Sequence, residues 1–464
     1  MRKHFDFYGY TSPTAGKYYL GGFEYFYGED FRSVKRYKEY KDVGFNVLLL
    51  QHENSYSGEE WENSACNKCM TNGYAAGLDR IIVSDTRLKD LCEEKVLIGE
   101  DGRFKTEEEF LQYLDDCTKP YRDRPGFFGV QLFDEPPYWK FESYGKVCRG
   151  LKKILPDIFL QCNLLNYINP TLLCKDSSDR RKALTWYYNE FLDQAGLNYL
   201  MTDEYPFHKE YRISEFSIPV YQVLAEVCKA RGVEFRMVLQ SISHAHFILN
   251  KQGTIEGGVN YRRMLEKDMY WQMNLAMGFG CREYSYYTYF TKVRFNVRPD
   301  DLSLEGIDGS SFITRDGSRT KLYYYTKRII KEVKAFEEVL LKYSYENSYF
   351  FFEEGKGAQD FNQTSMAIMD GGKCPIDVKV SDGVVIVTHQ RSDVGSLYMV
   401  ENIGNLKDTF AEDYQKMRVK ISLGKDALNV KLYKKGKEIS RKMKDGVFTE
   451  RLDVGEAIFI EVLG

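Results

Sequence analysis

The sequence of 464 residues lacks an apolar run approaching the roughly 20 residues of a membrane span. Its longest runs, such as FNVLLLQ at 45–51, have the length of a strand. It also lacks an excess of one charge, because 65 basic and 68 acidic residues give a formal net charge of −3, whereas nucleic-acid-binding domains carry a basic patch. The opening MRKHFDFYGYTSP has no apolar core behind its basic residues. We therefore predict no membrane segment, no nucleic-acid partner and no signal peptide.

Patterns that specify metal, redox or nucleotide chemistry are missing as well. The ten cysteines show no disulfide spacing, which favours reduced thiols and a cytoplasmic location. CNKC at 66–69 is a lone CxxC, and His244 and His246 have no obvious third ligand. No glycine-rich phosphate loop and no Ser/His/Asp order stands out. We expect no cofactor and no metal.

Up to about residue 340, short β-type runs alternate with longer stretches of helical spacing. The predicted strands are 18–26, 45–51, 78–85, 126–135, 158–166, 198–207, 234–243 and 281–289. The clearest predicted helices are 30–44, 106–126, 180–196, 213–232, 260–280 and 318–343. Eight strands, each followed by a helix, predict a (β/α)8 TIM barrel. The main alternative is a doubly wound open sheet, which usually has a phosphate loop after its first strand.

After Tyr343 the pattern changes to short alternating strands separated by Gly, Asp and Asn turns, as in VSDGVVIVTHQR and GEAIFIEVLG. This pattern predicts an antiparallel β-sandwich packed on the barrel. We place the catalytic barrel at 1–345 and the C-terminal sandwich domain at 346–464.

Functional residues of a (β/α)8 barrel gather at the carboxyl ends of the strands. The run FFGVQLFDEPPYW at 127–139 ends in Asp134 and Glu135, and the run at 198–207 contains Asp203 and Glu204. Amides, imidazoles and phenols follow other predicted strands. The mixture suits a polyhydroxylated carbohydrate substrate. Expected substrate contacts are Asn163, Asn166, Tyr205, His208, Gln240, His244, Tyr287 and Trp139.

Glycoside hydrolysis needs one protonated carboxyl group and one ionised carboxylate. If Val130 and Leu132 face the helices, strand alternation puts Asp134 on their side and turns Glu135 into the barrel. We therefore predict Glu135 as the general acid/base, with a pKa raised by its sheltered position. The alternative role for Asp134 and Glu135 is a helix-capping turn.

The second carboxylate is left open by the sequence, because the predicted strand 234–243 ends without one. Asp203 and Glu204 lie at the correct end of their strand, although they could instead support loops. Glu283 lies at the start of its strand, so we expect a structural role for it.

The series FDEPPY, QCNLLN, DEYPF and GFGCREYSYYTY resembles barrel glycoside hydrolases related to clan A, including the family 42 β-galactosidase-like enzymes. RDGSRTKLYYYTKRIIKEVKAFEEVLL is similar to their closing helix. The resemblance covers most of 15–345 and, more loosely, the C-terminal region. It implies a retaining mechanism with Glu135 as acid/base and a nucleophilic Glu on strand seven. This chain has Gln240 and Ser241 there instead.

The Asp134–Glu135 pair also resembles family 123 N-acetylhexosaminidases. That resemblance implies a substrate-assisted mechanism in which Glu135 donates the proton and Asp134 orients the acetamido group. Three hypotheses follow: a glycoside hydrolase with two protein carboxylates, a substrate-assisted N-acetylhexosaminidase, and a non-catalytic carbohydrate-binding barrel. Barrels of this kind often pair, so a homo-oligomer is a further expectation.

Overall fold

The structure is a computed structural model of the chain. It describes residues 4–20, 23–26, 29–166, 173–174, 179–208, 213–214, 216–243, 245–249, 255–291, 294–295, 311–314, 316–361, 366–404, 416–424 and 429–463.

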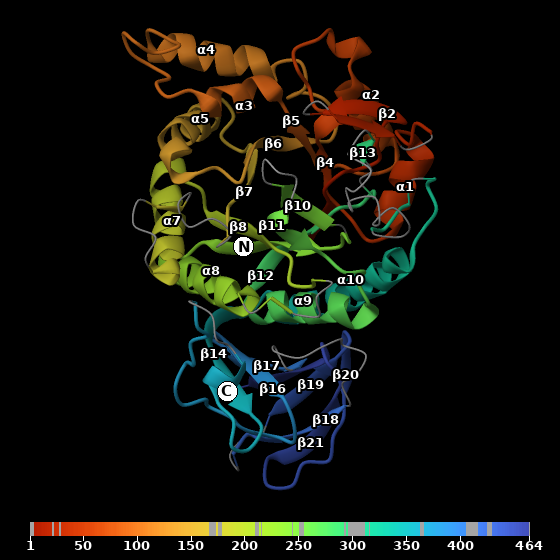
Figure 1. The fold of residues 1–464 in the computed structure, drawn as a ribbon, viewed down its shortest axis with the longest axis vertical. Helices are drawn as coiled ribbons and strands as arrows, with labels where there is room; N and C mark the ends of the chain where they lie inside the picture. The colour runs from red at the N-terminus through yellow and green to blue at the C-terminus, as the bar shows by residue number, and fades with distance from the viewer. Residues whose placement is uncertain are drawn as a thin grey trace.

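Parallel strands lie at the centre of the N-terminal part of the chain, with helices around them (Figure 1). They form two four-stranded parallel sheets, in the orders β1-β12-β9-β8 and β4-β5-β6-β7. Their bounds are β1 (Asp6–Gly9), β4 (Leu48–Leu50), β5 (Ile81–Ser84), β6 (Phe127–Asp134), β7 (Phe159–Asn163), β8 (Tyr199–Glu204), β9 (Glu234–Gln240) and β12 (Cys281–Tyr287). β5 and β8 are buried along their whole length, as parallel strands covered on both faces should be.

The two parallel sheets meet at both of their edges. Beyond the end of β7, Leu164 N donates to Met201 O of β8 at 2.9 Å. At the other edge, Asn46 N, just before β4, donates to Phe7 O of β1 at 3.0 Å. The mixed α/β architecture therefore has hydrogen bonds between its two sheets on both sides.

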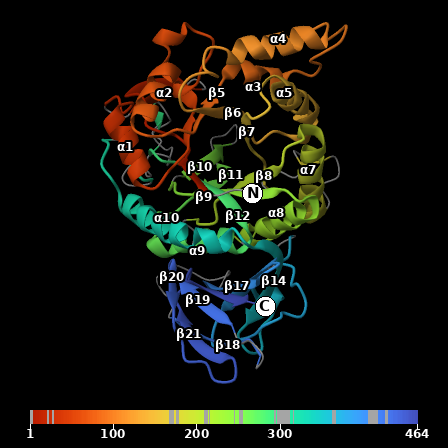
Figure 2. The same ribbon diagram turned by 180° about the vertical axis from the view of Figure 1, so that it is seen from behind.

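Helices follow the parallel strands and surround them in both views (Figures 1 and 2). They are α1 (Val34–Asp42), α2 (Ala65–Ala75), α3 (Thr86–Glu93), α4 (Glu107–Thr118), α5 (Phe141–Ile154), α7 (Arg180–Ala195), α8 (Ser217–Arg231), α9 (Glu266–Gly278) and α10 (Lys321–Leu340), with short 3-10 turns η1 (His52–Asn54), η2 (Trp61–Asn63) and η3 (Tyr138–Lys140). Local sequence sets their ends. In α7, the Asp179 side chain accepts from Lys182 N, and Gly196 ends the helix at φ +64°.

The prediction of the first strand at 18–26 is wrong. This segment forms the hairpin of β2 (Lys17–Leu20) and β3 (Phe23–Phe26), which joins β13 (Arg294–Phe295) in an antiparallel sheet. The first parallel strand is instead the four-residue β1. β1 is too short to show a clear pattern of apolar residues in the sequence. Glycine is required at position 9, because a Cβ there would lie 2.9 Å from Tyr289 Cβ. The other seven predicted strands each contain a parallel strand.

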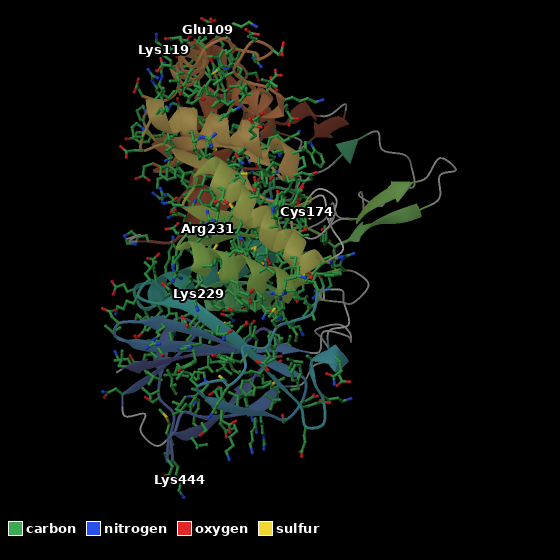
Figure 3. The ribbon with its side chains drawn as sticks, turned by 90° about the vertical axis from the view of Figure 1, so that its left-hand side faces the viewer. Glu109, Lys119, Cys174, Lys229, Arg231 and Lys444 are labelled. Carbon is green, nitrogen blue, oxygen red and sulfur yellow. The ribbon has the colours of Figure 1, made fainter. Side chains whose placement is uncertain are left out.

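A second hairpin, β10 (Ala245–Leu249) and β11 (Ile255–Asn260), follows the carboxyl end of β9. Figure 3 shows it projecting from the body of the molecule. His246 belongs to β10, whereas His244 lies outside the described residues.

The C-terminal part of the chain forms two antiparallel sheets, with orders β14-β16-β17-β22-β19-β20 and β15-β18-β21. The strands are β14 (Ser344–Phe352), β15 (Asp377–Val380), β16 (Val384–Ser392), β17 (Gly395–Gly404), β18 (Met417–Ser422), β19 (Val430–Lys434), β20 (Lys437–Ile439), β21 (Val447–Leu452) and β22 (Ala457–Leu463), with the short α11 (Ala358–Phe361) after β14. Val400 and Ile460 of the first sheet share a buried cluster with Val419 and Phe448 of the second. The division of the chain at residue 345 stays a prediction.

Two further observations bear on the sequence predictions. None of the helices in the described ranges is long and apolar enough to cross a bilayer. All ten cysteines are free, and Cys66 and Cys69 of the CNKC segment are buried on α2.

β17, which packs against α9, carries an unusual carboxyl group. Glu401 of β17 is fully buried, and neither of its side-chain oxygens has a hydrogen-bond partner among the described residues. Burial raises the pKa of Glu401 well above its ordinary value, which favours the protonated form in the folded chain. The nearby Glu461 of β22 differs, because the hydroxyls of Tyr343 and Tyr433 both donate to it at 2.9 Å.

We expect Glu401→Met to raise the free energy of unfolding at pH 7 by about 1–3 kcal/mol, because an apolar side chain removes an unsatisfied buried carboxyl group. Ionisation of Glu401 favours the unfolded chain, since its pKa is higher in the folded state. The gain should therefore increase as the pH rises above about 4.3, the ordinary pKa of glutamic acid. Urea unfolding from pH 5 to pH 8 measures it. Glu461→Met is the matched control and should destabilise, and equal effects of the two substitutions would contradict this account.

Candidate active site

The carboxyl ends of β6, β7 and β8 bring together four of the predicted site residues: Asp134, Glu135, Asn163 and Asp203. Asn163 Nδ2 donates to Asp203 Oδ1 at 3.3 Å, which ties β7 to β8. Glu135 N donates to Asn163 O at 2.8 Å, which ties β6 to β7. The middle strand therefore positions both acidic neighbours.

The expectation that Asp134 points toward the helices is wrong. The register of β6 against β7 shifts between Gln131 and Phe133, so that Asp134 pairs with Asn163. A bulge of this kind reverses the alternation of side chains beyond it. Asp134 is exposed, and its charge acts on Asp203 and Glu135 and raises their pKa values. Both members of the Asp134–Glu135 pair therefore belong to the site.

Glu135 occupies the left-handed region of backbone conformation, with φ +54°. Non-glycine residues avoid this region, at a cost of about 1–2 kcal/mol, and such residues cluster at functional sites. Glu135 follows the bulged strand and precedes Pro136. The Glu135 carboxyl group interacts with that of Asp203, and this interaction raises the pKa of Glu135.

The two contacting carboxyl groups differ in the interactions that shift their pKa values. Burial is the largest cause of the raised pKa of Glu135, and the charges of Asp203 and Asp134 raise it further. Burial also raises the pKa of Asp203, but hydrogen bonds from Asn163 and Tyr205 oppose this rise. Two contacting carboxyl groups titrate as a pair that shares one proton. These opposing effects favour the protonated form of Glu135 and the ionised form of Asp203.

Glu204, the alternative second carboxylate, faces another part of the structure. It is 1% exposed, and Ser217 Oγ at the start of α8 donates to it at 2.5 Å. Asn166 Nδ2 donates to the backbone oxygen of Asp203 at 3.0 Å and approaches Glu204 Oε2 at 3.4 Å. Burial raises the pKa of Glu204 to about 8. Of the two acidic neighbours on β8, Asp203 is therefore the one that contacts Glu135.

Aromatic side chains adjoin the carboxyl pair. The rings of Tyr205 and Tyr287 stack with centroids 5.6 Å apart, and Tyr205 also contacts Tyr261 edge-on at 5.6 Å. His208 lies beyond them, with its ring 5.2 Å from that of Tyr261. Trp139 stands farther along the loop after β6, on η3, and is 56% exposed.

The side-chain amide of Gln240, a predicted substrate contact, forms hydrogen bonds within the protein. Its side-chain oxygen accepts from Phe207 N at 2.8 Å, and its nitrogen donates to Phe207 O at 3.0 Å and Ile242 O at 3.2 Å. The residue is 0% exposed. Its amide holds the backbone that follows β8, which is a positioning role rather than the predicted substrate contact.

Tyr10, Gln161 and Lys89 adjoin the site and were missed by the sequence prediction. Tyr10 follows β1, the strand that the sequence prediction misplaced. Gln161 Nε2 donates to the Tyr10 hydroxyl at 2.8 Å. Burial, and then the charge of Asp134, raise the pKa of Tyr10. Lys89 of α3 donates to Gln131 Oε1 at 3.2 Å, and Gln51 donates to the same oxygen at 3.0 Å. The sequence around Lys89 contains no signal that identifies it as a site residue. Tyr10 could have been predicted if the first parallel strand had been located correctly, because it follows the carboxyl end of that strand.

Four buried amide atoms near these residues have no hydrogen-bond partner in the described part of the chain. They are Gln51 Oε1, Gln131 Nε2, Gln161 Oε1 and Asn163 Oδ1. Buried polar groups are normally paired, and unpaired ones require an explanation. The donors and acceptors that they offer match the hydroxyl groups of a polyol.

Glu283 lies at the opposite end of the strands, as expected. Tyr8 OH donates to it at 3.1 Å, and Arg236 forms an ion pair with it at 3.2 Å. Within the described ranges, no group of three or more His, Cys, Asp or Glu residues could hold a metal ion.

Comparison with known proteins supports the fold. No protein-family model and no curated protein matches the sequence. A solved structure described as a glycoside hydrolase is similar, with 10% identity and a TM-score of 0.50, over 99% of this chain and 92% of that chain. An endo-β-1,4-mannanase from Thermotoga petrophila has 11% identity and a TM-score of 0.43, over 97% and 98% of the two chains. An Anoxybacillus α-amylase has 12% identity and a TM-score of 0.48, over 92% and 89%.

We expect Glu135→Gly to be more stable than Glu135→Ala by about 1 kcal/mol, because only glycine adopts φ +54° without strain. Chemical denaturation of the two variants measures the difference. The control is Lys379, an exposed residue in β15, where glycine should be less stable than alanine by about 0.5–1 kcal/mol. The same order of stability at both positions would show that Glu135 is not strained.

Proposed function

We propose that this protein is a glycoside hydrolase in which Glu135 is the general acid/base and Asp203 is the second carboxylate. The observation that carries the proposal is the interaction of the Glu135 and Asp203 carboxyl groups at the carboxyl ends of parallel strands. Burial and neighbouring charges raise the pKa of Glu135, while hydrogen bonds from Asn163 and Tyr205 oppose the rise for Asp203, which favours a protonated Glu135 beside an ionised Asp203. Glycoside hydrolysis requires this combination. The solved structure with the similar fold is itself described as a glycoside hydrolase.

We further infer that the eight parallel strands form a closed (β/α)8 barrel followed by a β-sandwich. The hydrogen bonds from Leu164 to Met201 and from Asn46 to Phe7, which join the two sheets at both edges, support closure. A closed barrel gathers functional residues from all its strands at one end, where the acidic residues lie. The cytoplasmic location and the homo-oligomer expected from the sequence stay predictions.

In the proposed reaction, Glu135 gives its proton to the glycosidic oxygen as the bond to the anomeric carbon breaks. The Asp203 carboxylate, oriented by Asn163 and Tyr205, stabilises the positive charge that develops on the sugar or attacks its anomeric carbon. Glu135, now ionised, then takes a proton from the water that attacks the sugar. The unpaired amides of Gln51, Gln131 and Gln161 would bind sugar hydroxyls.

A substrate-assisted N-acetylhexosaminidase is the second candidate, and two observations favour it. The Glu135 and Asp203 carboxyl groups are in contact, whereas the two carboxyl groups of a retaining pair lie roughly 5 Å apart. β9, the seventh parallel strand, ends in Gln240 without a carboxylate. The acetamido oxygen of the substrate would then attack the anomeric carbon, while Asp203 or Asp134 holds the acetamido N–H.

We expect Glu135→Gln and Asp203→Asn each to lower kcat at least about 100-fold, the usual minimum effect of removing a general acid or base. A panel of nitrophenyl glycosides that includes N-acetylated sugars measures the rates. Glu204→Gln is the matched control on β8 and should retain the rate, because Glu204 faces Ser217. In the wild type, activity should fall at high pH as Glu135 loses its proton and at low pH as Asp203 gains one. No release of nitrophenol from any glycoside would leave the carbohydrate-binding barrel as the better description.

The two mechanisms predict different intermediates. With two protein carboxylates in a retaining reaction, a 2-fluoro glycoside should trap a covalent sugar on Asp203, which peptide mass spectrometry would detect. With substrate assistance, no covalent adduct should form, hydrolysis should be restricted to N-acetylated sugars, and a thiazoline analogue should inhibit it. A covalent adduct on Glu204 would contradict both mechanisms.

A further inference from the structure

The loop after β6 carries aromatic side chains away from the carboxyl pair and onto the protein surface. Trp139 is 56% exposed, and Trp186 of α7 is 42% exposed. Tyr138 stands between them, with its ring 5.2 Å from that of Trp139 and 5.7 Å from that of Trp186. The chain has four tryptophans, and the other two, Trp61 and Trp271, are buried. Both exposed tryptophans therefore belong to one aromatic cluster.

The cluster has a fixed support. Tyr187 OH of α7 donates to Pro136 O at 2.5 Å, which ties α7 to the loop directly after Glu135. Lys140 forms an ion pair with Glu93 of α3, and its Nζ lies 5.0 Å from the centre of the Phe133 ring. The rings are thus held from both sides, so that little side-chain and loop freedom is lost when a ligand binds.

The cluster also lies close to the site along the chain. Trp139 follows Glu135 by four residues, so their Cα atoms lie at most about 14 Å apart. A short oligosaccharide spans such a distance. Exposed aromatic rings offer apolar faces for the C–H faces of sugars, while the Trp N–H remains free for a hydroxyl group.

We propose that Tyr138, Trp139 and Trp186 form a binding platform for the sugar units of a chain that extends beyond the cleaved bond. Such a platform favours an oligosaccharide or polysaccharide substrate over a glycoside of a single sugar. This inference rests on the proposed function for its link to catalysis, but binding to the platform can be measured without turnover.

The first experiment measures binding. Cello-, xylo-, manno- and chito-oligosaccharides of increasing length are titrated into the full-length protein, with intrinsic tryptophan fluorescence and calorimetry as readouts. We expect saturable binding of at least one series, strengthening with chain length. Trp139→Ala and Trp186→Ala should each weaken it about tenfold, whereas Tyr324→Ala, at an exposed aromatic residue of α10 with 55% exposure, should not. The proposal is overturned if no oligosaccharide binds or if Tyr324→Ala has the same effect.

The second experiment separates the platform from the catalytic assignment. It compares nitrophenyl glycosides of one sugar with those of longer chains. Trp139→Ala should raise KM for the longer chains about tenfold more than it raises KM for the single-sugar glycoside, whereas Tyr324→Ala should leave both values unchanged. An equal loss on both substrates would overturn the platform while leaving the hydrolase intact. Oligosaccharide binding without any turnover would support the platform and reject the proposed hydrolysis.

Discussion

The site depends on one unfavourable proximity: two carboxyl groups, Glu135 and Asp203, are held in contact in a largely buried place. Such a pair cannot ionise fully without strong repulsion, so it is stable only while one proton is shared. The strand between them makes this arrangement possible. Asn163 of β7 accepts from the Glu135 backbone and donates to Asp203, so one residue fixes the spacing of both. Hydrogen bonds from Asn163 and then Tyr205 oppose the rise in the pKa of Asp203, which favours its ionised form.

The backbone of β6 adds a second constraint. Regular alternation would have turned Asp134 and Glu135 to opposite sides of the strand. The register shift after Gln131 and the left-handed conformation of Glu135 instead bring both carboxyl groups to the site. Burial first, and then the charges of Asp203 and Asp134, raise the pKa of Glu135, a shift in the direction that the proposed general acid needs at neutral pH. The strained backbone thus coincides with the place where burial and like charges raise the pKa of a carboxyl group, as strained residues at functional sites often do.

Prediction from sequence succeeded where the signal is periodic and failed where it depends on tertiary geometry. Seven of the eight parallel strands were located because each is an apolar run bounded by turn residues. The first was missed because β1 is short, and Tyr10 was lost with it. The side of β6 that bears Asp134 was mistaken because a bulge changes no residue type. The sequence could not choose between Asp203 and Glu204, since only the neighbours Asn163 and Ser217 distinguish them.

The hydrogen bonds of Gln240 explain why the chain has a glutamine at the position where the resemblance to clan A implies a nucleophile. Trp271 Nε1 of α9 donates to Ile403 O of the C-terminal sheet at 3.4 Å, and the next residue, Gln272, bonds the backbone of Gln240 at both its N–H and its oxygen. Gln240 in turn binds both backbone groups of Phe207, two residues beyond Tyr205. A continuous series of contacts thus runs from the C-terminal sheet through α9 to the residue that orients Asp203. A carboxylate at position 240 could accept from Phe207 N but could not donate to Phe207 O. Gln240 therefore fixes the loop after β8, and β9 ends without a carboxylate.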